Sequence, residues 1–171
     1  MGLASRVLRI QPGEGRIAGL VVGLAFVAMT SFTLGESAVD ALFFDRVGAQ
    51  ALPVTYILQG GASFALMLVL TGTLGRLGPR RTYLSAPLAV GTVLLAERAL
   101  LVTNARWIYY VLWVTAALGS LLLAISLWGV AGTVVDTRQA KRLFPIFGAG
   151  GILGSVVGGV LTRPLAGMIG T

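Results

Sequence analysis

The sequence contains neither cysteine nor histidine. Without cysteine, no disulfide framework and no thiolate metal site can form. Without histidine, the commonest general base and metal ligand is missing as well. Ser–His and Cys–His catalytic pairs are therefore impossible, and the sequence holds no metal-ligand cluster. These absences argue against an enzyme, a bound metal and a resident cofactor.

Charge is also scarce: charged residues make up 11% of the 171 residues, and hydrophobic residues make up 56%. Soluble domains carry about 25% charged residues. A soluble fold of this length could not hide so much apolar surface from water, whereas the core of a bilayer is itself apolar. The net charge of +7 does not indicate a nucleic-acid partner, because the basic residues sit in short loops between apolar runs.

The chain divides into a short polar start and five apolar runs. Each run is long enough to cross a hydrocarbon core of about 30 Å at about 1.5 Å per residue. Residues 1–15 have no cleavage site and no short apolar core after their basic part, so we expect a cytoplasmic tail and not a signal peptide. Residues 16–171 are predicted to be an all-α membrane bundle. The expected spans are residues 17–43, 52–74, 83–102, 107–135 and 143–166.

The distribution of basic residues predicts the orientation of the bundle. With the N-terminus in the cytoplasm, nine of the 13 basic residues fall on the cytoplasmic side. Such a bias follows the positive-inside rule. The residues expected on the other side are Arg46, Arg98, Arg106 and Arg163.

Two acidic residues, Glu36 and Asp40, are spaced i, i+4 near the end of the first apolar run. If the helix continues, they share one face at membrane depth, and intramembrane carboxylates are candidates for binding a solute, a cation or a proton. If the helix ends by Gly35, both acids lie in a solvated loop. Arg163, on the fifth run, is the cation that we expect to share a cavity with them.

The fifth run contains two interleaved four-residue repeats of small residues. Gly150, Gly154 and Gly158 form one repeat, and Gly151, Ser155 and Gly159 form the other. Small residues at this spacing let helix backbones approach closely in lipid. A phosphate-cradling loop would need a preceding strand and Lys-Ser or acidic partners, which are missing here. We therefore predict a helix-packing face.

A polar stripe formed by Tyr56, Gln59 and Ser63 lies along one face of the second run. It either lines a cavity or forms hydrogen bonds between helices, and we favour the second interpretation.

The loop after the second run has a recognisable pattern. Arg76, Gly78, Arg80 and Arg81 match the signature between helices two and three of the major facilitator superfamily, which this segment resembles. Gly75 stands where that signature has an acid. The other interpretation is an ordinary basic hairpin produced by the positive-inside bias.

A second pattern extends across the fourth and fifth runs. The residues that form it are Trp128, Gly129, Ala140, Lys141, Arg142, Pro145 and Gly148. This pattern resembles the corresponding segment of the ATP/ADP antiporters, the nucleotide exchangers of plastids and intracellular bacteria with many uncharacterised bacterial relatives. Segments 35–42 and 48–53 are similar to the first extracellular region of the same family.

The departures from that family concern charge. The exchangers carry a Lys before the Asp that matches Asp40, and Val39 stands there in this chain. They also carry a Glu on helix four shortly before a Gly-Ser pair, where this chain has Ala116 and Ala117. A phosphate-bearing ligand needs cations to replace its lost hydration. The resemblance therefore implies the fold more strongly than the cargo.

We expect the chain to be most of the N-terminal half of a secondary transporter for a small solute. Five spans are one short of a three-plus-three half, so a sixth helix and a second half are expected to follow Thr171. The resemblance to the bacterial relatives implies the inner (plasma) membrane of a bacterium, with the N-terminus in the cytoplasm. The competing hypothesis is a membrane anchor or regulatory module that does not transport.

The predicted topology can be tested by accessibility labelling, because the chain has no native cysteine. Cysteines introduced singly at Arg76 and Arg46 should react with a membrane-impermeant reagent from opposite sides. Labelling of both from the same side would exclude the topology.

Overall fold

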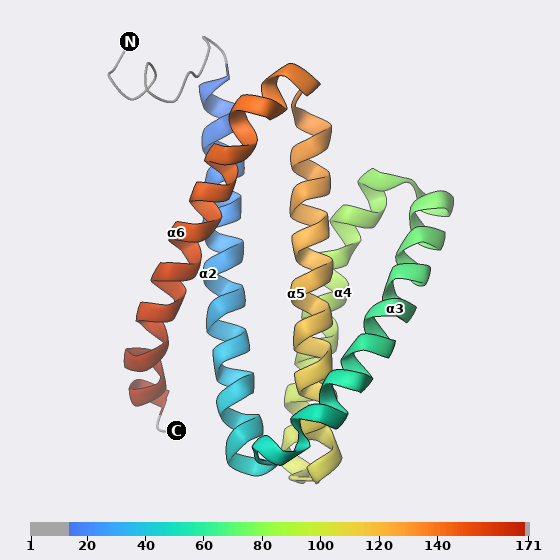
Figure 1. Cartoon of the computed structure of the whole chain (residues 1–171), viewed down its shortest axis with the longest axis vertical. Coiled ribbons are helices and arrows are strands. Elements are labelled where there is room, and N and C mark those ends of the chain that lie inside the picture. The colour runs from blue at the N-terminus through green and yellow to red at the C-terminus, as the bar shows by residue number, and fades with distance from the viewer. Residues whose placement is uncertain (1–13, 170–171) are drawn as a thin grey trace. The chain divides into compact units, whose positions relative to one another are not determined.

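The computed structural model describes residues 14–169, with side chains described as far as Pro164. Within that range the chain forms long helices joined by short turns, without a strand (Figure 1). The predicted all-α class with about five long helices is confirmed. Most of the predicted tail, residues 1–13, lies outside the described residues. The elements are α2 (Gly15–Arg46), η1 (Ala49–Ala51), α3 (Leu52–Leu77), α4 (Pro79–Leu100), η2 (Leu101–Thr103), α5 (Arg106–Val134) and α6 (Thr137–Ile169).

Each of the five long helices is apolar and long enough to cross a membrane. In the most apolar stretch of each, at most 33% of the residues are buried within the chain. Large side chains such as Leu20, Ile57 and Leu88 are exposed. Because water would not tolerate so much apolar surface, the chain is an integral membrane protein with five candidate spans among its described residues.

Helix α6 begins earlier than the basic residues around Lys141 suggest. The Asp136 N–H donates to the Gln139 Oε1 at 3.0 Å, which is the reciprocal half of a capping box. The Asp136 carbonyl accepts from the Ala140 N–H at 2.7 Å and closes the first turn. The basic residues expected in a loop therefore lie in the first two turns of α6.

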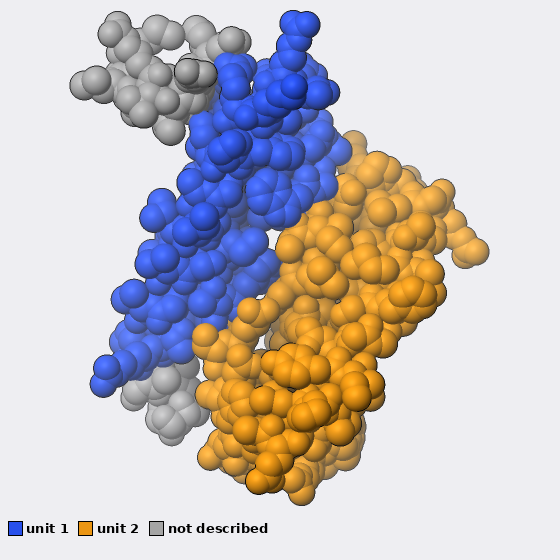
Figure 2. Space-filling model, viewed as in Figure 1, with its two compact units in different colours: residues 1–34, 127–171 blue, residues 35–126 orange. Residues whose placement is uncertain are grey.

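The chain forms two compact units, coloured blue and orange in Figure 2. Unit 1 consists of Met1–Leu34 and Leu127–Thr171, and unit 2 consists of Gly35–Ser126. Helices α2 and α5 contribute residues to both units. Each unit has its own packing.

In unit 1, α6 packs through Gly150, Gly154 and Gly158 against α2. A Cβ at Gly150 would lie 2.8 Å from the Val22 side chain, and one at Gly158 would lie 2.8 Å from the Thr30 carbonyl oxygen. At Gly154 an added Cβ would collide with the backbone of Phe26. The residues of α2 that these glycines contact, Val22, Phe26 and Thr30, are also four positions apart and follow in the same order along the chain. The two helices therefore run parallel (Figure 1).

The second small-residue repeat of α6 is not used in the same way. A Cβ at Gly159 would meet nothing within 4 Å, and one at Gly151 would meet only the Met29 side chain at 3.3 Å. The Thr30 hydroxyl adds a polar contact to the first repeat, donating to the Gly154 carbonyl oxygen at 3.0 Å. Only the Gly150–Gly158 face therefore requires small residues.

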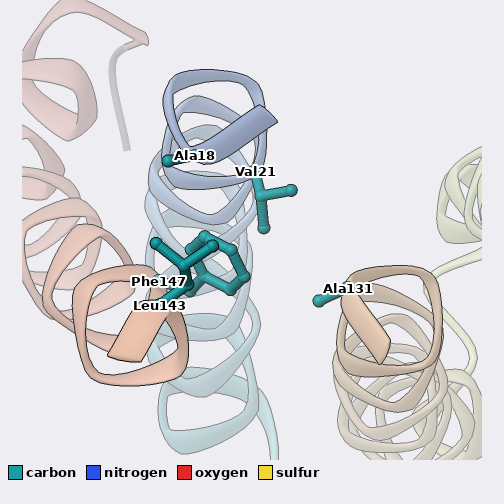
Figure 3. Packing of buried hydrophobic residues seen from close by; sticks show 5 residues of the cluster. All are labelled: Ala18, Val21, Ala131, Leu143 and Phe147. Atoms are coloured by element: carbon teal, nitrogen blue, oxygen red, sulfur yellow. The ribbon is translucent and has the colours of Figure 1, made fainter. Parts of the chain in front are cut away.

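A cluster of buried apolar residues lies in unit 1 near the start of α6 (Figure 3). Ala18 and Val21 of α2 pack with Leu143 and Phe147 of α6, and Ala131 of α5 completes the cluster. All five side chains are buried.

In unit 2, Gly78 alone joins α3 to α4. Its φ of 77° lies in the left-handed region that glycine adopts without strain, and Pro79 occupies the first position of α4, where its missing N–H does no harm. The loop motif is thus a one-residue turn, with Arg76 in the last turn of α3 and Arg80 and Arg81 in the first turn of α4.

The close approach of α6 to α2 predicts an asymmetric response to bulk. Gly154→Leu should destabilise the fold by about 3 kcal/mol, because it forces two backbones apart. The matched control is Gly159→Leu, which adds the same side chain to the same helix where no atom is near. Folded yield and thermal unfolding in detergent measure both variants. Equal melting of the two would contradict this packing.

Candidate functional site

The two acids predicted on the first span lie on a helix. Helix α2 continues through Gly35 to Arg46, which excludes the alternative of a solvated loop starting at Gly35. Glu36 and Asp40 are therefore one turn apart on the same face, and both side chains are exposed within the chain.

The two carboxylates border a cavity of about 210 Å³ that lies wholly within unit 2. Helix α2 contributes its acidic face, α3 contributes two polar side chains, and α5 contributes one aromatic and two small side chains. The lining residues are Glu36, Val39, Asp40, Tyr56, Gln59, Trp113, Ala116 and Ala117. We call this cavity the acidic pocket.

Trp113 of α5 fixes one side of the acidic pocket. Its indole Nε1–H donates to Asp40 Oδ1 at 2.7 Å. The same ring lies edge-on to Tyr56, with centroids 5.3 Å apart, and packs against Phe43 at 5.7 Å. Asp40 is thus held by a charge-assisted hydrogen bond, and two aromatic rings stand beside it.

Among the described residues, the charged side chains that line the acidic pocket are all negative. None of the described residues that line it is Lys or Arg. The nearby pair of Asp45 and Arg46, 3.0 Å apart, is exposed and does not line the pocket. Glu36 makes no hydrogen bond or ion pair within the described structure. Two carboxylates beside aromatic rings can attract a cation, which interacts with both the charges and the ring faces.

The remaining predicted site residue, Arg163, lies on α6 in unit 1, where its side chain is exposed. The acids belong to unit 2. Its role as their partner stays a prediction.

Sequence reasoning missed the aromatic part of the site. Of the two interpretations of the polar stripe, hydrogen bonds between helices were favoured, but Tyr56 and Gln59 line the acidic pocket and neither makes such a bond in the described residues. No sequence signal singled out Trp113. Only the packing of α5 against α2 shows that this face meets the acids.

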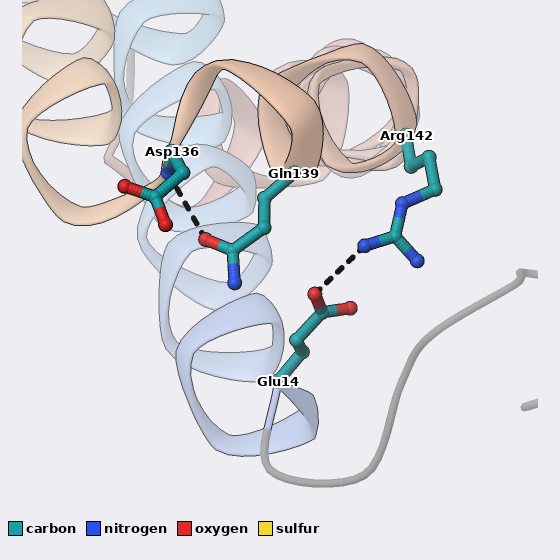
Figure 4. Close-up of polar contacts among 4 residues, drawn as sticks. All are labelled: Glu14, Asp136, Gln139 and Arg142. Carbon is teal, nitrogen blue, oxygen red and sulfur yellow. Dashed lines mark hydrogen bonds and ion pairs between the residues drawn. The ribbon is translucent and has the colours of Figure 1, made fainter.

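A second polar cluster lies in unit 1 at the start of α6 (Figure 4). The Arg142 guanidinium lies 2.9 Å from Glu14 Oε1, and the Glu14 side chain is only 8% exposed. A cavity of about 720 Å³ beside this pair is also lined by Asp136 and Gln139. The ion pair ties the residue that precedes α2 to the first turns of α6. We regard it as structural, since both charges are already neutralised.

Comparison with known proteins agrees with the resemblance seen in the sequence. A protein-family model, the TLC ATP/ADP transporter, matches residues 87–170. Neither the curated proteins nor the solved structures provide a match. The matched range includes Trp113, Ala116 and Ala117 of the acidic pocket, whereas its α2 and α3 residues lie outside. Residues 87–170 of this chain thus form a partial domain of the TLC ATP/ADP transporter family, which is related to the major facilitator superfamily.

Proposed function

We propose that the chain is the N-terminal part of a secondary active transporter that binds a small cationic solute in the acidic pocket. The observation that carries this proposal is the pocket lining: two carboxylates, two aromatic rings and, among the described residues, no basic side chain. Membrane transporters of this kind bind their cargo between repeats near the bilayer midplane and alternate access around it.

The lining residues argue against a nucleotide as cargo. Val39, Ala116 and Ala117 all border the acidic pocket. The resemblance to the ATP/ADP antiporters implies a Lys at the position of Val39 and a Glu near the two alanines. These are the positions at which this chain has lost charge. Burying a phosphate without a cation costs several kcal/mol, and Glu36 and Asp40 add repulsion.

The same lining favours a small organic cation. A volume of about 210 Å³ is below the range of about 300–1,000 Å³ of typical ligand sites. The unpaired Glu36 supplies a charge, and Trp113 and Tyr56 supply ring surface that attracts ammonium groups. In the proposed transporter, the second half supplies the opposite wall.

The proposed orientation rests on the basic-residue bias, which supports an N-terminus in the cytoplasm. The proposed membrane, the inner (plasma) membrane of a bacterium, rests on the family resemblance. The close contact between α2 and α6 within unit 1 suits a helix pair that moves together during alternating access.

Nucleotide exchange should be weak or absent. Proteoliposomes containing the full-length protein are loaded with ADP, and uptake of labelled ATP is measured against empty vesicles. Robust ADP-stimulated ATP uptake would refute the proposal and would mean that Arg163 or the second half supplies the missing positive charge.

Removal of either pocket charge should weaken cation transport. Asp40→Asn and Glu36→Gln should each reduce uptake of radiolabelled tetraethylammonium by about tenfold or more, because an interaction with a charged group contributes about 1.5–3 kcal/mol. Asp45→Asn is the matched control, since it removes the same charge from the same helix outside the pocket. A folded protein that takes up neither probe would favour the membrane anchor.

A further inference from the structure

Glu97 of α4 is a buried acid that the acidic pocket does not use. Its side chain belongs to a candidate span and is only 5% exposed. Its Oε2 atom is buried and has no hydrogen-bond partner among the described residues. A carboxylate at such a place would carry charge on an oxygen that neither donor nor water reaches, which is strongly unfavourable in an apolar surrounding.

The other oxygen of Glu97 has one neighbour, Thr115 of α5. The Thr115 Oγ1 lies 2.5 Å from Glu97 Oε1 and 2.6 Å from the Val111 carbonyl oxygen. A threonine hydroxyl has a single hydrogen, so it cannot donate fully to both oxygens. One hydrogen shared between two acceptors serves each less well, so a hydrogen from another group would stabilise one of these two short contacts.

Only the carboxyl group of Glu97 can supply that hydrogen. If Glu97 carries a proton on Oε1, it donates to Thr115 Oγ1, and the Thr115 hydroxyl donates to Val111. Both short contacts then contain one hydrogen each. The unpartnered Oε2 becomes the carbonyl oxygen of a neutral acid, which is much less costly to bury without a partner than a charged oxygen.

The surroundings supply no compensating cation. On α4, the neighbouring Arg98 is exposed, and at the start of α5 the exposed Arg106 donates to the Val47 carbonyl oxygen. The Tyr109 hydroxyl of α5 donates to Asn104, and Asp40 of α2 accepts from Trp113. No ion pair to Glu97 is present in the described residues. Among the described residues, Thr115 is therefore the one polar side chain that is hydrogen-bonded to it.

We propose that Glu97 is a proton-binding site of this transporter, with its proton shared toward Thr115 across the contact between α4 and α5. The helices are held together here, because a Cβ at Gly119 would lie 3.0 Å from the Val90 side chain. Release of the proton from Oε1 requires a water molecule to accept it, and a hydrogen-bond donor or a cation near Oε2 to stabilise the charge left behind. Both require a local separation of α4 from α5. This inference is independent of the cationic solute proposed for the acidic pocket.

Infrared spectroscopy of the full-length protein in lipid tests the proton directly and needs no solute. A protonated carboxyl group has a carbonyl-stretch band well separated from those of carboxylates, and the band shifts in deuterated water. Glu97→Gln should remove such a band. Glu36→Gln, the matched control for an exposed acid, should leave it unchanged. Loss of only a carboxylate band in Glu97→Gln would overturn the proposal.

The Thr115→Val variant provides a second test in case Glu97→Gln does not fold. It keeps the shape of the side chain and removes the hydroxyl group that accepts the hydrogen bond from the protonated Glu97. The acid band should move to higher frequency, because its hydrogen bond is lost. A spectrum without an acid band, or with a band that Thr115→Val does not move, would also overturn the proposal.

Discussion

Every helix of this chain must satisfy its own polar groups, because the surface that surrounds it is apolar. The hydroxyl side chains show how this is done. Thr71, Thr73 and Ser31 are each hydrogen-bonded to a carbonyl oxygen one turn earlier on their own helix, at 2.7–2.9 Å. Such local bonds let a polar side chain face lipid without an unpaired donor. The described polar groups that are not satisfied in this way are the candidates for function.

The acids illustrate the same rule, because three of the described acids have partners of different kinds. Glu14 has an arginine, Asp40 has an indole N–H, and Glu97 has a hydroxyl group. Glu36 is the acid on α2 that the described structure leaves without a partner. A charge left open at membrane depth is tolerated where it serves binding. The acidic pocket thus combines the Glu36 carboxylate, which has no partner among the described residues, with the Asp40 carboxylate, which accepts a hydrogen bond from Trp113.

Much of the fold could be predicted from composition and spacing, because membrane helices follow local rules. The four-residue spacing of Gly150, Gly154 and Gly158 was visible in the sequence, although only the structure shows that Gly159 meets nothing. At the start of α6, the Gln139 side chain accepts a hydrogen bond from the Asp136 N–H, and no hydropathy pattern reveals this contact. Contacts such as Trp113 with Asp40 join residues far apart in the chain, so spacing along one helix could not have found them.

The single-residue turn at Gly78 has a consequence for biogenesis. Because Gly78 alone joins α3 to α4, no linker would allow one helix to insert into the bilayer while the other stays at a distance. Their shared end also carries arginines, whose transfer through hydrocarbon is strongly unfavourable. The two helices are therefore expected to enter the membrane together as one helical hairpin, with the Gly78 end remaining at the surface from which insertion starts.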